Sequence, residues 1–251
     1  MNDAPKKYAY GWIPDVPDSR DLLYKTVKPR KLRVPKKTDL RGLCSKVENQ
    51  GTLGSCTANA LAGNIEFLDM KDGDEKYTDA SRLFIYYNER VILHTVSSDS
   101  GAMLRDGIKS LNKEGVCSES SWPYEIKKFT QRPPKRCYAQ AQSHRIESYR
   151  RLLSLADMLN CLAEGFPFVF GFAVYESFES AVTARTGIVK MPKKDEKMLG
   201  GHAVLAVGFN QTEKRFLVRN SWGERWGMGG YCTMPFKYLE TLADDFWTIR
   251  K

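Results

Sequence analysis

The sequence predicts an α+β fold of two lobes, a helical lobe followed by a lobe built on a β-sheet or β-barrel. Two observations support this prediction. Apolar residues recur every three or four positions in the first half of the chain, and apolar runs of strand length occupy the second half. With 251 residues, 42% of them hydrophobic, the chain can bury a substantial core. It has no run of eighteen apolar residues, so no membrane-spanning helix is expected.

Three helices are expected in the first half of the chain. The first begins at Cys56 and ends at Gly73, and the second follows Thr78-Asp79. The third ends at Gly115. Their inward faces should carry the apolar residues that recur at helical spacing, which are Ala60, Leu61, Ile65, Phe67, Leu68, Leu83, Phe84, Tyr87, Val91, Leu93, Leu104, Ile108 and Leu111. Prolines interrupt residues 118–143, which we expect to form a long loop.

A fourth helix and five strands are expected in the second half. Ser154, with Asp157 three residues later, is typical of a helix N-cap, and Gly165 is typical of the end of that helix. Its buried face should hold Leu155, Met158, Leu159 and Leu162. The strands are expected at residues 166–172, 187–189, 203–209, 216–219 and 231–234.

The proline-containing residues 1–34 are expected to form an extended N-terminal segment ahead of the folded body. The body, residues 35–251, would hold its helical lobe mainly in residues 50–143 and its β lobe mainly in residues 144–235. Residues 1–37 hold ten Lys/Arg and four Asp, a net charge of +6 out of the total of +9. Nucleic-acid binding requires basic residues clustered on a folded face, so we interpret this charge as solvated and expect no nucleic-acid partner.

The sequence indicates neither a compartment nor a membrane partner. Its N-terminus lacks the apolar stretch of a signal peptide. Nothing in the residues indicates an oligomer, and a monomer is the simpler expectation. The six cysteines include no C-x-x-C pair, so neither a zinc site nor a dense disulfide framework is expected; they are Cys44, Cys56, Cys117, Cys137, Cys161 and Cys232.

Cys56 is the candidate nucleophile. A glycine-punctuated segment, Gln50–Cys56, leads directly into the first predicted helix. The thiolate is the reactive form of cysteine, and a helix N-terminus or an adjacent imidazolium lowers the pKa of the thiol. The alternative interpretation is a buried cysteine that packs as a small hydrophobe.

Three histidines compete for the role of base. His94 closes the second helix, and His144 lies in polar surroundings. His202 follows Gly200-Gly201 and precedes an apolar strand, and two glycines allow another backbone or a ligand to approach closely. We therefore select His202, with a structural role at a strand edge as the alternative.

Asn220, Trp222 and Gln50 complete the candidate site. Asn220 follows a strand that can pair with the His202 strand, so its amide can orient the imidazole. Trp222 would then shield that hydrogen bond from water. The side-chain N–H of Gln50, with the backbone N–H of Cys56, can stabilise an oxyanion. Turn chemistry for Asn220 and core packing for Trp222 are the alternatives.

These segments together resemble the papain-like cysteine peptidase family, from about Pro35 to Tyr231. The motifs that carry the resemblance are Gln50…Gly54-Ser55-Cys56, Gly201-His202-Ala203, Asn220-Ser221-Trp222-Gly223, Trp226-Gly227…Gly230-Tyr231, Asp39-Leu40-Arg41 and Trp122-Pro123-Tyr124. Against the signature C-G-[SA]-C-[WY] around the nucleophile, Leu53 replaces the first cysteine and Thr57 replaces the aromatic residue. Leu53 removes one end of a disulfide that is common in secreted relatives.

The resemblance implies a two-lobed fold with Cys56 as nucleophile in the cleft between the lobes. His202 would act as general base and then general acid, oriented by Asn220, and Gln50 would donate to the oxyanion. The reaction would be hydrolysis of peptide or protein substrates through a thioacyl intermediate, with no metal or organic cofactor.

The resemblance also implies a substrate-binding surface. Gly101 would pair with the substrate backbone, and the residue before the scissile residue would meet small or apolar neighbours. The substrate-binding residues are Gly101, Met103, Gly171, Gly200, Gly201, Ala203 and Trp222. Such small walls predict an open, apolar pocket with a preference for hydrophobic side chains, and no histidine-pair loop redirects the enzyme from endopeptidase activity.

Two hypotheses concern the extension and the reaction. Tyr10–Asp15 and Ser19–Asp21 have a composition suited to packing, so residues 1–34 would lie on the body and cross the cleft as a latch that is removed for activity. A passive surface strap is the alternative. Two other functions stay open: an acyltransferase or amidase using the same thiol, and a non-catalytic binding module that keeps the cleft.

Overall fold

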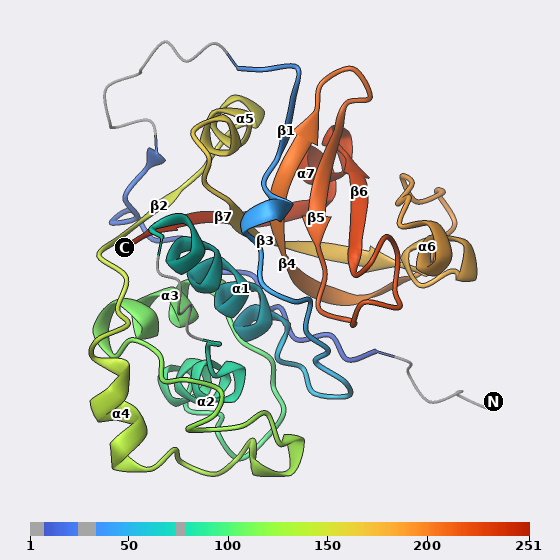
Figure 1. Ribbon diagram of the computed structural model, residues 1–251. Helices are drawn as coiled ribbons and strands as arrows, with labels where there is room; N and C mark the ends of the chain where they lie inside the picture. The colour runs from blue at the N-terminus through green and yellow to red at the C-terminus, as the bar shows by residue number, and fades with distance from the viewer. Residues whose placement is uncertain (1–7, 25–33, 74–78) are drawn as a thin grey trace, which may run out of the picture.

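The computed structural model describes residues 8–24, 34–73 and 79–251, and its fold is α+β, as predicted. The helices that precede residue 142 gather on one side of the molecule, and the curved sheet lies on the other side with the later helices (Figure 1). The helices are α1 (Cys56–Lys71), α2 (Arg82–Ile92), α3 (Leu104–Lys113), α4 (Lys135–Ala141), α5 (Leu155–Ala163), α6 (Ala181–Thr186) and α7 (Phe236–Leu242). The strands are β1 (Lys37–Asp39), β2 (Ser148–Arg151), β3 (Phe168–Tyr175), β4 (Met198–Asn210), β5 (Arg215–Arg219), β6 (Tyr231–Pro235) and β7 (Ala243–Arg250). No helix in these ranges is long and apolar enough to span a membrane.

Within the described residues the seven strands form one antiparallel sheet in the order β2-β7-β3-β4-β5-β6, with β1 beside β4. The long strand β4 is central, paired with β3 on one side and β5 on the other. In this register His202 of β4 lies opposite Phe172 of β3. Strand β5 ends at Arg219, so Asn220 follows directly beside the His202 strand.

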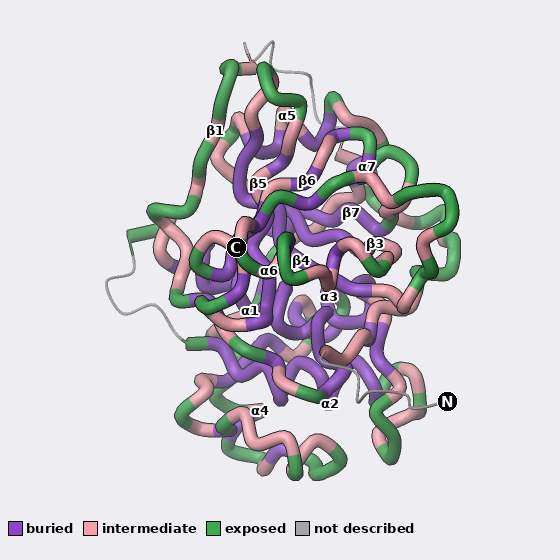
Figure 2. Tube along the Cα trace, turned by 90° about the vertical axis from the view of Figure 1, so that its right-hand side faces the viewer, coloured by how far each residue is buried: buried purple, intermediate pink, exposed green. Residues whose placement is uncertain are grey.

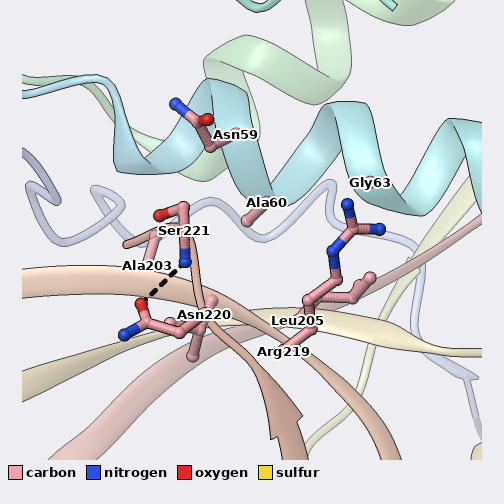
Figure 3. A pocket seen from close by; sticks show the side chains of 9 residues that line it. Asn59, Ala60, Gly63, Ala203, Leu205, Arg219, Asn220 and Ser221 are labelled. Carbon is pink, nitrogen blue, oxygen red and sulfur yellow. Dashed lines mark hydrogen bonds between the residues drawn. The ribbon is translucent and has the colours of Figure 1, made fainter. Parts of the chain in front are cut away.

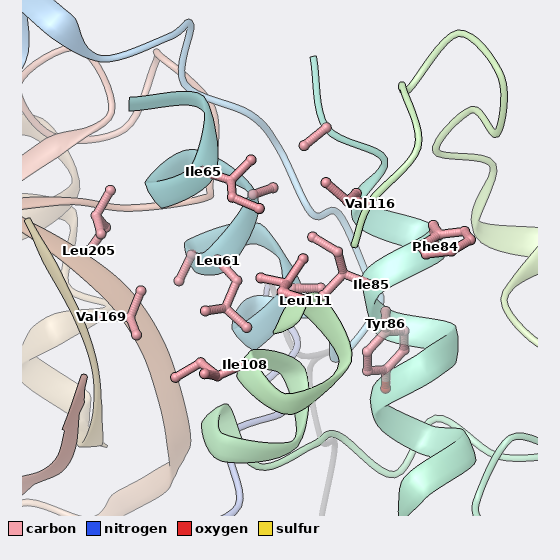
Figure 4. Packing of buried hydrophobic residues seen from close by; sticks show 14 of the residues in the cluster. Leu61, Ile65, Phe84, Ile85, Tyr86, Ile108, Leu111, Val116, Val169 and Leu205 are labelled. Carbon is pink, nitrogen blue, oxygen red and sulfur yellow. The ribbon is translucent and has the colours of Figure 1, made fainter. Parts of the chain in front are cut away.

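Helix α1 lies in the middle of the molecule, between the sheet and the other helices. Leu61 and Ile65 lie between Val169 and Leu205 on the sheet side and Ile85 on the helical side (Figure 4). Nearly every residue of α1 is buried, because a helix covered on all sides has no solvent face to carry polar residues. The buried segments, purple in Figure 2, lie in the middle of the molecule.

A second core fills the sheet side of the molecule. It is dominated by aromatic rings, with Phe168, Phe170 and Phe172 in consecutive contact along β3. Helices α5 and α7 close this core through residues such as Met158 and Tyr238. Strand β4 contributes side chains to both cores, so its residues lie at the junction of the two lobes.

Several predicted helix signals are confirmed. Helix α1 begins at Cys56, and Ser154 caps α5 by accepting a hydrogen bond from the Asp157 N–H at 3.2 Å. The apolar residues predicted for α3 are buried in the core. In α5 Met158 and Leu162 are buried, whereas Leu155 and Leu159 are only partly buried.

Two expectations for the helical lobe are wrong. Residues 118–143 are not a continuous loop, because α4 starts directly after Pro134, where proline is tolerated as the entry to a helix. In α2, Val91 is 44% exposed, since the helix ends on the surface one residue later. The N-cap of α2 is Ser81, which accepts from the Phe84 N–H; Thr78 lies outside the described residues.

One expectation for the β lobe is also wrong. Residues 187–189 are not a strand, because the segment turns out of α6 through Gly187 and makes a single bridge between Ile188 and Thr233. The sequence analysis also missed α6, α7, β1, β2 and β7. Strand β7 is the most consequential omission, because it lies between β2 and β3 and adds Trp247 and Ile249 to the central core.

Candidate active site

Cys56 stands at the first turn of α1 and its side chain is fully buried. The loop before it turns at Gly51, whose φ of 61° is readily adopted only by glycine. Ser55 does not cap the helix backbone; its hydroxyl instead lies 2.5 Å from the Tyr124 hydroxyl. Burial raises the pKa of Cys56 to about 12, although the backbone N–H groups of Ala203 and Gly11 act in the opposite direction.

His202 and Asn220 form the hydrogen bond that the sequence predicts. The distance from His202 Nε2 to Asn220 Oδ1 is 2.8 Å, and both side chains are buried. The Ser221 N–H also donates to Asn220 Oδ1 at 2.8 Å, drawn as the dashed line in Figure 3, which fixes the orientation of the amide. Because Oδ1 accepts, Nε2 is the protonated nitrogen, and Nδ1 of the neutral ring is free to accept a proton.

The Nδ1 atom of His202 is buried and has no hydrogen-bond partner among the described residues. Burial lowers the pKa of His202 to about 4, against a smaller opposite effect of the Asn220 hydrogen bond. The Cys56 thiol lies near the N–H of Ala203, the residue that follows His202. Both groups are therefore neutral in this closed arrangement, and the helix N-terminus does not outweigh burial of the thiol.

Gln50 is held by the segment that carries Asn220. Its Oε1 atom accepts from the Ser221 hydroxyl at 2.6 Å, which fixes the orientation of the amide and turns Nε2 toward the cleft. Nε2 donates to the carbonyl oxygens of Leu53 at 3.0 Å and Ala9 at 3.2 Å. A peptide carbonyl thus already occupies the donor predicted for an oxyanion.

Trp222 covers the His202–Asn220 pair. Its ring lies 5.0 Å from the His202 ring, centroid to centroid, with an angle of 29° between the planes. Phe178 packs against Trp222 at 5.3 Å, and the Trp222 side chain is almost fully buried. This position excludes water from the imidazole–amide hydrogen bond, as expected.

A segment from the N-terminal extension, residues 8–13, lies across these groups; we call it the plug. The Tyr8 ring stacks on Trp222 at 3.8 Å with the planes nearly parallel, and Trp12 donates from its backbone N–H to the Gly201 carbonyl at 3.0 Å. Ala102 accepts from the Ile13 N–H at 2.9 Å and donates to the Gly11 carbonyl at 2.7 Å. The plug thereby covers the three candidate groups together: Cys56, His202 and Gln50.

The predicted substrate-binding glycines lie against the plug. A Cβ atom on Gly171 would fall 1.9 Å from the Trp12 ring, and one on Gly201 would fall 2.6 Å from the Trp12 carbonyl oxygen. Gly200 faces the Tyr10 ring in the same way. Only residues without a side chain allow this approach.

Three other predicted substrate-binding residues border this surface. Gly101 lies against the Gly11 backbone, while its neighbour Ala102 makes the hydrogen bonds to the plug. Met103 is half-buried and follows Ala102 at the start of α3, and Ala203 is buried behind the thiol.

Residues 15–24 lie beyond the plug and bind the body at α3, β2 and β7; we call them the clasp. Asp15 accepts from Trp247 Nε1 at 2.8 Å and from the Arg105 N–H at 3.1 Å. Asp21 accepts from Arg105 Nη2 at 2.5 Å and from Arg151 Nη1 at 3.3 Å. The Arg151 N–H donates to the Leu22 carbonyl, which adds a backbone attachment beside β2.

The two departures from the family signature have structural reasons. Thr57 donates to Glu89 Oε2 at 2.8 Å inside the helical lobe, where its short side chain is fully buried. Leu53 is 2% exposed and packs in the central core in place of a disulfide end. All six cysteines are free thiols.

A small cavity of about 10 Å³ lies behind the site, between α1 and strands β4 and β5. Asn59, Ala203, Asn220 and Ser221 line it (Figure 3). In the part of the chain that the structure describes, no group of three or more His, Cys, Asp or Glu residues is placed to hold a metal ion.

Sequence reasoning missed two residues of this region. Ser221 fixes both amides, Gln50 through its hydroxyl and Asn220 through its N–H, and its place inside the Asn-Ser-Trp motif was the available signal. Asp245 contacts the plug from β7, and no sequence signal pointed to it because β7 itself was not predicted.

Comparison with known proteins agrees with this geometry. Residues 34–240 match the papain family of cysteine proteases. An uncharacterized peptidase C1-like protein of Acanthamoeba polyphaga mimivirus is 44% identical over 269 residues, 96% of this chain and 86% of the relative. Procathepsin L of Rattus norvegicus is 28% identical over 221 residues, 81% of this chain and 61% of the relative.

A solved structure extends the likeness to the whole chain. Xylellain, a cysteine protease from Xylella fastidiosa, superimposes with a TM-score of 0.90 at 42% identity, covering 100% of this chain and 99% of that one. Fold, site geometry and sequence matches agree. This chain belongs to the papain family of cysteine proteases.

Proposed function

We propose that this hydrolase is a cysteine endopeptidase that its own plug holds inactive until the plug leaves the cleft. The observation that carries the proposal is the Ala9 carbonyl, which lies 3.2 Å from Gln50 Nε2. The cleft therefore binds a peptide backbone at the atom where a tetrahedral intermediate needs a donor.

The chain's own residues supply each step of the reaction. His202 Nδ1 takes the Cys56 proton as the sulfur bonds to the scissile carbonyl carbon, and the carbonyl oxygen becomes an oxyanion. Gln50 Nε2 and the Cys56 N–H donate to that oxyanion. The imidazolium returns its proton to the departing amine, which leaves a thioacyl enzyme.

Water completes the cycle. His202 removes a proton from a water molecule that attacks the thioester carbon, and the Cys56 sulfur leaves with the proton that His202 returns. Asn220 keeps the ring in the tautomer with Nε2 protonated throughout, because its Oδ1 is fixed as an acceptor by Ser221.

Burial by the plug supports the inactive state. With the thiol pKa raised to about 12 and the imidazole pKa lowered to about 4, neither group is charged at neutral pH. Removal of the plug would return water and let the thiolate–imidazolium pair form, because burial is the first cause of both shifts.

The direction of the plug supports its role as an inhibitor instead of a substrate. Tyr8 lies on Trp222, while Trp12 lies on the glycines that the family resemblance assigns to the residue before the scissile residue. The C-terminal side of the plug therefore occupies the place of the acyl side of a substrate. The plug therefore crosses the cleft in the direction opposite to that of a substrate.

A test compares labelling and hydrolysis in the full-length chain and in Gly11→Ala. A Cβ on Gly11 would lie 1.7 Å from the Gly54 carbonyl oxygen, so this variant displaces the plug without altering the body. We expect iodoacetamide to label Cys56 in Gly11→Ala, and a protein substrate to be cleaved at internal bonds.

Two catalytic variants in the Gly11→Ala background complete the test. Cys56→Ala and His202→Ala should each lower hydrolysis by about a hundredfold or more. The matched control is Cys232→Ala, another fully buried thiol, which should leave hydrolysis unchanged. Equal labelling of several cysteines, or products in which an added amine replaces water, would contradict the peptidase assignment.

A further inference from the structure

Two segments of the body lie on either side of the plug at Gly11. One contains Gly54, which precedes Cys56 in the nucleophile loop, and the other contains Gly101. A Cβ on Gly11 would lie 1.7 Å from the Gly54 carbonyl oxygen, and a Cβ on Gly101 would lie 2.2 Å from the Gly11 carbonyl oxygen. The gap between the two segments therefore fits a peptide backbone closely.

A chain of hydrogen bonds through Asp99 joins these two segments. The Gly54 N–H donates to both carboxylate oxygens of Asp99, at 3.1 Å to Oδ1 and 3.0 Å to Oδ2. The Tyr86 hydroxyl also donates to Asp99 Oδ1, and it accepts in turn from the Gly101 N–H at 3.1 Å. We call Asp99 and Tyr86 the clamp. It connects the backbone that leads to the nucleophile with the backbone on the other side of the plug.

The helical lobe holds both members of the clamp. Tyr86 lies in α2 and is fully buried. Burial, followed by the hydrogen bond to Asp99, raises the pKa of its hydroxyl, which therefore stays protonated and able to donate. Arg90, one turn later in α2, lies 4.1 Å from the centre of the Tyr86 ring. Its guanidinium donates to the carbonyl oxygens of Val96 and Ser98 at 3.0 Å each, so the segment that carries Asp99 is attached to the same helix.

Hydrogen bonds are the tie that the structure shows between these two segments. All six cysteines are free thiols, so no disulfide joins the Gly54 segment to the Gly101 segment. A hydrogen bond to a carboxylate is shorter and stronger than one between neutral groups, and it contributes about 1.5–3 kcal/mol. The clamp makes two contacts of this kind, one from each side of the gap, and can therefore fix the width of the gap.

We propose that Asp99 is a positioning residue that sets the distance between the Gly54 and Gly101 segments and so prepares the gap for a substrate backbone. This inference rests on the peptidase function proposed above, because a substrate would take the place of the plug. The plug already uses the gap in this way, since the Ala102 N–H donates to the Gly11 carbonyl at 2.7 Å. A site whose partners are already in place loses less free energy in ordering them when a substrate binds.

The test compares a long and a short substrate in the full-length Gly11→Ala chain. One fluorogenic amide has three residues before the scissile bond and reaches the Gly101 segment, whereas the other has a single residue and does not. We expect Asp99→Asn to lower the ratio of kcat/KM for the long to that for the short substrate about tenfold, mainly through KM. The cause is that an asparagine oxygen carries no charge and its amide nitrogen cannot accept. Iodoacetamide should label Cys56 at an unchanged rate, because this small reagent does not use the gap.

Tyr86→Phe is the second variant, and it keeps the buried ring. It removes the hydroxyl between Asp99 and Gly101, so it should lower the same ratio to a similar extent. The double variant with Asp99→Asn should lower the ratio little further, because both residues act in one chain of hydrogen bonds. Tyr138→Phe is the matched control. Its hydroxyl lies 3.1 Å from Asn88 Oδ1, also in α2 but outside the clamp, so the ratio should not change.

The possible outcomes separate this inference from the proposed function. If the ratio keeps its Gly11→Ala value in both Asp99→Asn and Tyr86→Phe, Asp99 does not prepare the gap. An equal fall in labelling and in the turnover of both substrates would also overturn the proposal, because it would show a general loss of structure. The peptidase function itself would be contradicted if Gly11→Ala hydrolysed neither substrate.

Discussion

The plug and the clasp are neighbouring parts of one segment, yet different forces hold them. Hydrogen bonds to Ala102, Gly201, Gln50 and Asp245 hold the plug, together with ring contacts. Among the described residues, the ion pairs between the N-terminal segment and the body all belong to the clasp, where Asp21 meets Arg105 and Arg151.

Because of this difference, the proposed inhibition by the plug should be separable from the attachment of the N-terminal segment by the clasp. Hydrogen bonds to charged groups at buried positions contribute about 1.5–3 kcal/mol each, whereas an aromatic pair adds about 0.5–1.5 kcal/mol beyond its buried area. The clasp makes several hydrogen bonds of the charged kind, whereas the plug makes one, from Trp12 to Asp245, so the plug should open more readily than the clasp. Changes in the plug should alter access to Cys56, and changes in the clasp should alter stability.

The largest expected effect is that of Gly11→Ala on access. The new methyl group would overlap the Gly54 carbonyl oxygen, and overpacking of this kind costs about 1–3 kcal/mol. At the upper end this raises the open population, and the Cys56 labelling rate, about a hundredfold. Gly42→Ala is the control, because a Cβ there has no atom within 4 Å. Labelling at the wild-type rate would mean that the plug does not restrict access.

The next effect is that of Asp21→Asn on stability. The side chains of Asp21 and Arg105 are 10% and 6% exposed, so loss of the charge leaves a buried guanidinium poorly paired. We expect the free energy of unfolding to fall by about 2 kcal/mol in denaturant titrations. Asp18→Asn, whose partner Arg20 is 85% exposed, should leave the transition in place. If Asp21→Asn opened the cleft as far as Gly11→Ala does, plug and clasp would not be separable.

A smaller effect is the pH dependence that Asp245 contributes. Burial, followed by the negative charge of Asp15, raises the pKa of Asp245 to about 7 in the folded protein, above the ordinary value near 3.9. The folded state then binds the proton more tightly, so this stabilisation is present at acid pH and lost as pH rises through 7. Relative to wild type, Asp245→Asn should gain about 1 kcal/mol of stability between pH 6 and pH 7. A constant difference across that range, measured by thermal unfolding, would rule out this titration.

The smallest effect is expected for Tyr8→Ala. It removes the ring stacked on Trp222 but keeps the backbone hydrogen bonds of the plug. The loss of one aromatic pair should raise the Cys56 labelling rate by about threefold. A rise as large as that of Gly11→Ala would assign the closure of the cleft to this one ring.

Short motifs were sufficient to select the candidate catalytic residues from the sequence. Cys56 follows a glycine-rich turn, His202 lies in β4, and Asn220 directly follows the adjacent strand β5. Local patterns in the sequence were sufficient to mark all three. Ser221 was harder to predict, because its function depends on two partners, one of them 171 residues away in the sequence.

Other features depend on tertiary contacts that the local pattern does not contain. Strand β7 has the polar residues Asp244 and Asp245 directly after its first residue, and they weaken the strand signal. Its place between β2 and β3 is set by long-range pairing. Helix α4 was hidden by the prolines that precede it. The contact of Asp245 with Trp12 could not be predicted, because it arises where β7 meets the N-terminal segment.

The covalent continuity between the N-terminal segment and the body has a consequence for regulation. An inhibitor within the same polypeptide does not dissociate on dilution, since its effective concentration near the cleft is of millimolar order for a short connection. Latency should therefore be the same in a dilute extract and in a concentrated one. A competing peptide added from outside must exceed that local concentration before it displaces the intramolecular occupant.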